Sequence, residues 1–83
     1  MSAGIDVDIE VDARNLLCPM PVIRCQGAAD GKPPGTRIRV IATDPGALSD
    51  IPAWSRVNGH TVIEARDEGD LIVVVVEVGE SAT

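Results

Sequence analysis

Apolar and polar residues alternate strictly in two parts of this chain. In residues 5–12, Ile or Val occupies every odd position and Asp or Glu every even position. This period-two pattern predicts a strand with one wholly apolar and one wholly acidic face. In residues 36–42, branched apolar residues alternate with Arg37 and Arg39. If the two strands are neighbours, we expect these arginines to face the acidic residues of the first strand, because opposite charges on adjacent strands stabilise a sheet.

Two longer segments predict helices. Residues 19–29 precede the turn-forming run Asp-Gly-Lys-Pro-Pro-Gly, which ends the first helix. The second helix extends to about residue 58, with Asp44 as its N-cap, Pro in its first position and Gly59 as a left-handed C-terminal cap. Pro52 is expected to kink this helix or to tighten its first half into a 3₁₀-like turn. The expected inner face consists of Ala47, Leu48, Ile51, Trp54 and Ser55.

The last third of the chain predicts a hairpin. Residues 61–66 form a strand with Ile63 and Ala65 pointing inward, an acidic turn follows at 67–70, and residues 71–78 form a strand that is apolar on both faces. If the odd positions of the last strand fill the core, its even positions form an apolar patch on the open face of the sheet. Such patches often mark interfaces.

The order of these elements predicts an α/β fold, a two-layer α/β sandwich of the order β-α-β-α-β-β, with a mixed four-stranded sheet and two helices on one face. The helical connection between the first two strands makes them parallel, and this crossover is expected to be right-handed. The hairpin of the last two strands is antiparallel. The order of all four strands stays open. Residues 1–83 are expected to form one domain, with an ordered core over about 5–78 and a loose tail over 79–83.

Composition narrows the possible partners. The formal net charge is −6, and the chain has one Trp but no Phe or Tyr. Nucleic-acid and membrane binding both use clusters of Lys and Arg, and single strands also stack on aromatic side chains. We therefore expect no direct nucleic-acid partner and no membrane partner. No segment is typical of a signal peptide or a membrane span.

The two cysteines, Cys18 and Cys25, are not expected to form a disulfide. On one helix they lie about 10.5 Å apart along the axis, whereas a disulfide needs Cα atoms within roughly 7 Å of each other. Without disulfides, a reducing compartment, the cytoplasm, is the simpler interpretation.

The segment Cys18-Pro19-Met20-Pro21 has the clearest chemistry. Pro19 suits the first position of a helix, because its missing N–H would be unpaired there. Cys18 then lies at or next to the N-cap, where the positive end of the helix dipole lowers the pKa of its thiol. Pro21 stiffens the first turn. The segment therefore predicts a reactive thiolate, and the alternative is a buried, inert cysteine.

Parallel strands bring the loops that follow them to one edge of the sheet, which places Cys18 near Asp44. A carboxylate opposes a thiolate if it is unpaired, but we expect Asp44 to cap its own helix, which continues through Pro45. Arg14 and Arg24 are the nearest cations along the chain. Each either stabilises the thiolate or is an ordinary surface residue.

The usual catalytic groups are missing from the sequence around this thiol. The only histidine, His60, follows the second helix and is expected at the opposite end of the sheet, as a structural residue. The chain has no Cys-x-x-Cys pair, and too few Cys and His residues for a closed zinc site. We expect no metal and no cofactor. A lone activated thiol suits a group carrier whose partner proteins supply the rest of the machinery, and whether it counts as an enzyme stays open.

Five segments resemble the TusA/SirA family of sulfur carriers. They are Asp12-Ala13-Arg14, Leu17-Cys18-Pro19-Met20-Pro21-Val22, Ala42-Thr43-Asp44-Pro45-Gly46, Asp50-Ile51-Pro52-Ala53-Trp54 and Gly59-His60. The resemblance extends from Ile9 to about Val76. It implies the same sandwich fold and a sulfurtransferase-type carrier in which Cys18 accepts sulfane sulfur as a persulfide.

The resemblance also implies partners. A sulfur donor protein, either a cysteine desulfurase or a rhodanese-like protein, would load the carrier, and an acceptor relay protein would take the sulfur onward. Met20 and Arg24 would lie on the same rim as Cys18 and touch these partners. Two positions depart from the family: Asn15 stands where Gly is common, and Ser55 stands where many members have a second Cys.

Two other functions are weighed against the carrier. A non-catalytic interaction or regulatory module would use the apolar patch of the last strand, through which a weak dimer could form; the carrier is expected to be a monomer. A thiol-dependent redox protein is least favoured, because it needs a resolving cysteine and Cys25 lies about two helical turns from Cys18.

Overall fold

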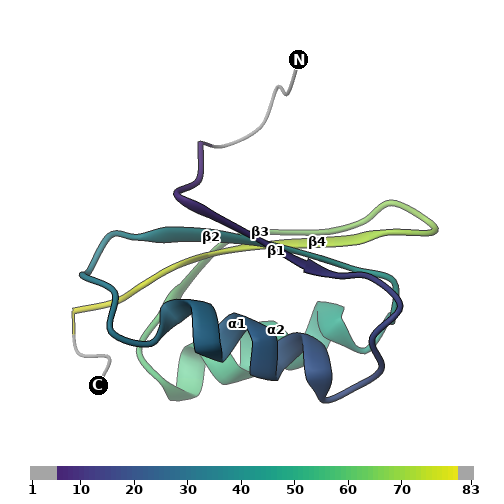
Figure 1. Ribbon diagram of the computed structural model, residues 1–83, viewed down its shortest axis with the longest axis horizontal. Helices are drawn as coiled ribbons and strands as arrows, with labels where there is room; N and C mark the ends of the chain where they lie inside the picture. The colour runs from purple at the N-terminus through teal and green to yellow at the C-terminus, as the bar shows by residue number, and fades with distance from the viewer. Residues whose placement is uncertain (1–5, 81–83) are drawn as a thin grey trace.

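The computed structural model describes residues 6–80, which form a two-layer α/β sandwich (Figure 1). In chain order the elements are β1 (Ile9–Ala13), α1 (Met20–Ala29), β2 (Arg37–Ala42), α2 (Ala47–Val57), β3 (Thr61–Asp67) and β4 (Ile72–Glu77). This order confirms the predicted fold class. The expected start of the first strand at residue 5 and the end of the tail at residues 81–83 lie outside the described residues.

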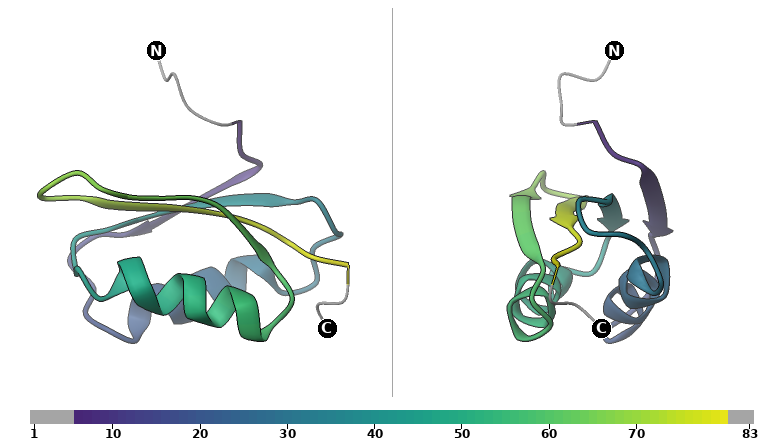
Figure 2. Two further views of the ribbon diagram at one scale, coloured as in Figure 1. Left: turned by 180° about the vertical axis from the view of Figure 1, so that it is seen from behind. Right: turned by 90° about the vertical axis from the view of Figure 1, so that its left-hand side faces the viewer.

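The strands form one sheet in the order β1-β2-β4-β3. β1 and β2 are parallel, and β4 runs antiparallel to both of its neighbours. Both helices cover the same face of this sheet, as the end-on view in Figure 2 shows. The sheet is mixed and four-stranded, as predicted, and the order places β4 in its interior.

β4 is buried on both faces, which corrects the expectation of an apolar patch. The odd residues Val73 and Val75 face away from the helices, yet they are only 5% and 0% exposed. In the register, Val75 lies between Arg39 of β2 and Glu64 of β3, whose long side chains extend over the sheet. The even residues fill the core instead of the open face; they are Ile72, Val74 and Val76.

Charged pairs cover the open face of the sheet. Arg39 lies directly opposite Glu10, and its Nη1 is 3.1 Å from Glu10 Oε2, as predicted. Arg37 differs, because its Nε lies 3.6 Å from Glu77 Oε2 on β4. The contact between Arg37 and Asp8 is made by the backbone N–H, which donates to Asp8 Oδ2 over 3.0 Å.

β3 departs from the simple alternation that was predicted. Its register with β4 shifts between Val62 and Glu64, so Ile63 has no direct partner. This is the effect of a β-bulge, which inserts an extra residue in one strand. Val62 therefore packs against the core in place of Ile63. Ala65 is exposed, because the β3–β4 hairpin extends beyond the helices (Figure 1).

α2 begins later than predicted and ends as predicted. Its N-cap is Gly46 rather than Asp44, and the α-helix continues through Pro52 without a 3₁₀ turn. Gly59 has a φ of +81°, and the N–H of the next residue donates to the Ser55 carbonyl over 2.8 Å, which closes the helix in a Schellman motif. The inner face is as expected, with Ala47, Ile51 and Ser55 buried and Leu48 and Trp54 packed against the core.

The chain after β4 is fixed at Gly79, which was expected to begin a loose tail. Its N–H donates to His60 Nδ1 over 3.2 Å. A Cβ at position 79 would lie 1.8 Å from the carbonyl oxygen of Gly59. The two backbones therefore approach so closely that only glycine fits.

Candidate functional site

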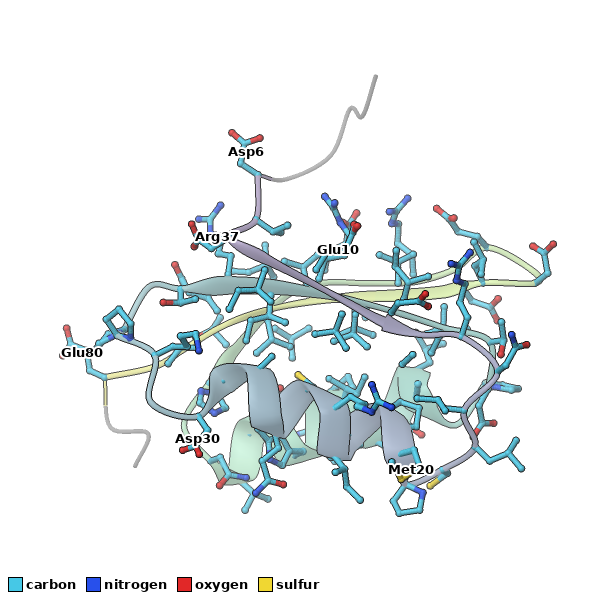
Figure 3. The ribbon with its side chains drawn as sticks, in the orientation of Figure 1. Asp6, Glu10, Met20, Asp30, Arg37 and Glu80 are labelled. Carbon is cyan, nitrogen blue, oxygen red and sulfur yellow. The ribbon has the colours of Figure 1, made fainter. Side chains whose placement is uncertain are left out.

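The candidate site lies where β1 and β2 end and both helices begin. This is the carboxyl edge of the parallel strand pair, as predicted. In Figure 3, Met20 marks this end of α1, and Asp30 marks the opposite end of the same helix. A hydrogen bond joins the two loops here. Asn15 has a φ of 66°, the left-handed conformation that its side chain tolerates, and its N–H donates to Thr43 Oγ1 over 2.9 Å.

Cys18 is exposed at this edge and lies next to the N-cap of α1, one of the two positions predicted for it. α1 begins at Met20, so Pro19 is the N-cap and Pro21 the second helical residue. The Cys18–Pro19 peptide bond is cis. Pro21 is also buried, in line with the helix's other buried residues at intervals of four, Cys25 and Ala29. Pro21 therefore holds the first turn of α1 against the core, in addition to the stiffening that was expected.

Two carboxylates hold Cys18. The backbone N–H of Cys18 donates to Asp44 Oδ2 over 2.8 Å. The Cys18 thiol donates to Asp50 Oδ2, with Sγ and oxygen 2.9 Å apart. Asp44 also accepts the N–H of Gly46 on its other oxygen, over 3.3 Å. Asp44 therefore binds the N-cap residue of α2 instead of being the N-cap itself, and it ties the cysteine loop to the start of that helix. Pro45 accepts the N–H of Leu48 on its carbonyl.

The expected lowering of the thiol pKa is wrong in direction. The hydrogen bond to the Asp50 carboxylate raises the pKa of Cys18, and partial desolvation and the negative charges of Asp50 and Asp44 raise it further. A thiol that donates to a carboxylate is stabilised in its neutral form. A full negative charge in direct contact outweighs the partial positive charge of a helix end. The resting site therefore holds a thiol rather than a thiolate.

The two predicted cations act elsewhere. Arg14 binds Asp12 through Nε at 2.9 Å and Nη2 at 3.0 Å, and this pairing lowers the pKa of Asp12 to about 2. Arg24 is exposed on α1, and its charge also lowers the pKa of Asp12. Among residues 6–80, no hydrogen bond or ion pair joins Arg14 or Arg24 to Cys18, so no contact supports the stabilisation of a thiolate by these arginines.

Three exposed apolar side chains lie on the cysteine loop and the first turn of α1. Leu17 is 75% exposed, Met20 36% and Ile23 48%. They follow one another at intervals of three residues, which places Met20 and Ile23 on one side of α1. We call these three residues the Leu17–Met20–Ile23 surface.

Comparison with known proteins places the chain in a family. The model of the family described as sulfurtransferase TusA matches residues 9–78. The chain belongs to the TusA family. It is 40% identical over 72 residues to the putative sulfur carrier protein YrkI of Bacillus subtilis, covering 87% of this chain and 96% of that protein. It is 38% identical over 64 residues to the sulfur carrier protein TusA of Allochromatium vinosum, covering 77% of this chain and 84% of that protein.

A solved structure supports the same fold. The crystal structure of a SirA-like protein from Desulfitobacterium hafniense has a TM-score of 0.75 and 25% sequence identity. The similarity covers 88% of this chain and 100% of that chain.

Among the described residues of this TusA-family chain, no helix is both long enough and apolar enough to traverse a bilayer.

Cys25 and His60 do not belong to the site of this TusA-family protein. Cys25 is fully buried, and burial raises the pKa of its thiol to about 12. His60 follows the far end of α2, where its ring packs against Trp54 with 4.7 Å between the ring centroids. Burial lowers the pKa of His60. The prediction of a structural His60 agrees with these contacts.

Asp50 is the site residue that sequence reasoning missed. It was quoted within a segment that resembles the family, but it was given no role. A usable signal was present, because an acidic residue in the first turn of α2 lies at the same edge as the cysteine loop. The hydrogen bond itself joins residues 32 positions apart, so its formation depends on how the two helices pack.

Proposed function

We propose that this protein is a sulfur carrier that accepts sulfane sulfur on Cys18 as a persulfide and relays it to a partner protein. One observation supports the choice of residue above the others. Cys18 is exposed at the shared edge of the two helices, where Asp44 and Asp50 hold its backbone and its thiol. Membership of the TusA family supports the choice of chemistry.

The arrangement favours a carrier over a redox protein. A disulfide-forming protein needs a second thiol that can reach the first, whereas Cys25 is buried in the core and both cysteines are free. A persulfide carrier needs only one accessible sulfur. The alternative function, an interaction module, depended on an exposed apolar patch on β4. It is not favoured, because Val73 and Val75 on the outer face of β4 are buried.

The Leu17–Met20–Ile23 surface is the proposed contact for partners. The donor would be a cysteine desulfurase or a rhodanese-like protein, and the acceptor a relay protein. Both must bring a reacting sulfur to Cys18, so both must cover this surface. Arg24 lies on the same exposed part of α1, and the net charge of −6 favours partners with basic residues around their docking site. A thiol that must stay free is maintained in a reducing compartment, which supports the cytoplasm.

The test is sulfur loading followed by intact-mass measurement. The protein is incubated with a cysteine desulfurase and cysteine, and we expect a mass gain of one sulfur atom that a reducing agent removes. Cys18→Ser should gain nothing, and Cys25→Ser should load like the wild-type chain. Equal loading of the wild-type chain and Cys18→Ser would contradict the proposal.

A further inference from the structure

Asp50 is the only charged residue among residues 6–80 that hydrogen-bonds the Cys18 sulfur. The thiol donates and the carboxylate oxygen accepts, over 2.9 Å. A group that accepts a proton during catalysis must lie within about 2.6–3.2 Å of the atom that carries it. The resting geometry already meets this condition.

The backbone around Asp50 fixes the position of its carboxylate. Asp50 lies in the first turn of α2, and its neighbour Ile51 is fully buried in the core. The N–H of Asp50 donates to the Gly46 carbonyl over 2.9 Å, which is the first hydrogen bond of the helix. On the other side, the backbone of Cys18 is held by Asp44. Both partners of the thiol–carboxylate pair are therefore anchored independently.

Other titratable groups near the thiol do not offer the same chemistry. From the β2–α2 loop, Asp44 faces the backbone of Cys18, and both of its oxygens already accept N–H groups. From the β1–α1 loop, Arg14 is bound by Asp12. From α1, Arg24 is exposed and can only donate. Asp50 is the group that faces the sulfur with a proton-accepting atom.

We propose that Asp50 is the proton acceptor and donor of the sulfur-transfer step at Cys18. This inference rests on the proposed carrier function and adds a residue to it. As Cys18 Sγ bonds to the terminal sulfur of a donor persulfide, its proton moves to Asp50 Oδ2. The sulfur–sulfur bond of the donor breaks, and the electron pair stays on the donor sulfur. Asp50 then returns the proton to that leaving thiolate, so a thiol and a persulfide become a persulfide and a thiol without any oxidant.

Sulfur release to an acceptor follows the reverse course. As the acceptor sulfur attacks the terminal sulfur of the Cys18 persulfide, the acceptor thiol gives its proton to Asp50, and Cys18 Sγ leaves with the electron pair of the broken sulfur–sulfur bond. A protonated Asp50 lies where it can return the proton to that sulfur. The same hydrogen bond therefore serves both directions, and the protein ends each cycle with the neutral thiol in which it began.

The experiment compares sulfur uptake from glutathione persulfide in rapidly quenched samples, read by intact mass. This small donor needs no docking surface. Asp50→Asn keeps the shape of the side chain but cannot accept the proton, and we expect uptake at pH 7 to fall roughly 10²-fold. Asp50→Glu should retain more activity than Asp50→Asn. Asp30→Asn, at the exposed C-terminal end of α1, removes the same charge at the opposite end of that helix (Figure 3) and should leave uptake unchanged.

The pH dependence separates proton transfer from a structural role. The ratio of wild-type to Asp50→Asn rates should shrink as pH rises, because the variant then forms its thiolate without a base. Uptake by Asp50→Asn that equals or exceeds wild-type uptake at pH 7 would overturn the proposal for Asp50, while the carrier function stands as long as the wild-type chain loads at Cys18. Should the amide variant fail to fold, as read by circular dichroism, Asp50→Ser provides the same comparison.

Discussion

The hydrogen bond between Cys18 Sγ and Asp50 Oδ2 sets the form in which the resting protein holds its sulfur. A carrier with an exposed thiolate would react with any electrophile that reached it. A neutral thiol paired with a carboxylate is less nucleophilic. The raised pKa of Cys18 is therefore consistent with a carrier that becomes reactive only when a suitable sulfur donor is in place.

Removal of the Asp50 charge should lower the pKa of the Cys18 thiol. In Asp50→Asn the thiol no longer donates to an anion, so more thiolate is present at neutral pH, and alkylation by iodoacetamide should become faster there. Iodide leaves without needing a proton, so alkylation reports the thiolate fraction alone. The pKa is read from thiolate absorbance in the ultraviolet across a pH titration.

Arg14→Gln provides the control for this titration. Arg14 is bound to Asp12, so its loss should leave the thiol pKa of Cys18 in place. A thiol pKa in Asp50→Asn that stays at the wild-type value or rises would show that the carboxylate does not set it.

At the scale of elements, α1 and α2 begin at one edge of the sheet and bring the cysteine loop and Asp50 together. α1 is held by a buried stripe of Pro21, Cys25 and Ala29. α2 is held at both ends, by Asp44 and Gly46 at its start and by Gly59 at its end. The far end of α2 also packs against the chain after β4, through His60 and Gly79.

Two glycine substitutions test how tightly these elements pack. Gly79→Ala should destabilise the fold by about 1–3 kcal/mol or more, because its Cβ would overlap the Gly59 carbonyl oxygen at 1.8 Å. Gly27→Ala, inside α1, has nothing within 4 Å of its Cβ and should stabilise by about 0.5–1 kcal/mol. The free energy of unfolding in urea gives both values. If Gly79→Ala matched the wild-type chain, the contact between β4 and α2 would be looser than described.

At the scale of the whole molecule, the sheet separates two surfaces of different character. The open face carries charged pairs such as Arg39 with Glu10. The edge with Cys18 carries the exposed Leu17–Met20–Ile23 surface. A partner that covers this edge buries apolar area and reaches the sulfur in the same encounter, which is what a relay between proteins requires.

Leu17→Ser should slow sulfur uptake from a cysteine desulfurase by about tenfold, the effect of a modest interface contact, and should leave uptake from glutathione persulfide unchanged. The matched control is Val57→Ser, because Val57 is 84% exposed at the far end of α2. Initial rates of loading, followed by intact mass, give the comparison. Equal slowing in both variants would place the donor contact outside the surface around Cys18.

Local features of this protein follow from its amino-acid sequence. The alternation in residues 5–12 predicted β1, the breakers after residue 29 predicted the end of α1, and Gly59 predicted the end of α2. Asn15 stands where Gly is common in the family, and it adopts a left-handed backbone, which Asn tolerates. Each of these depends on the conformational limits of a few neighbouring residues, so a single sequence is enough to predict them.

Tertiary structure decided the features that join distant segments. The position of β4 between β2 and β3, the bulge at Ile63 and the burial of Val75 depend on pairing between strands, which no local pattern specifies. The direction of the Cys18 pKa shift depends on Asp50, 32 residues away. The sequence alone indicated which sulfur is the candidate for the reaction, because that signal is a local motif, whereas the group that holds its proton was decided by packing two helices against one sheet.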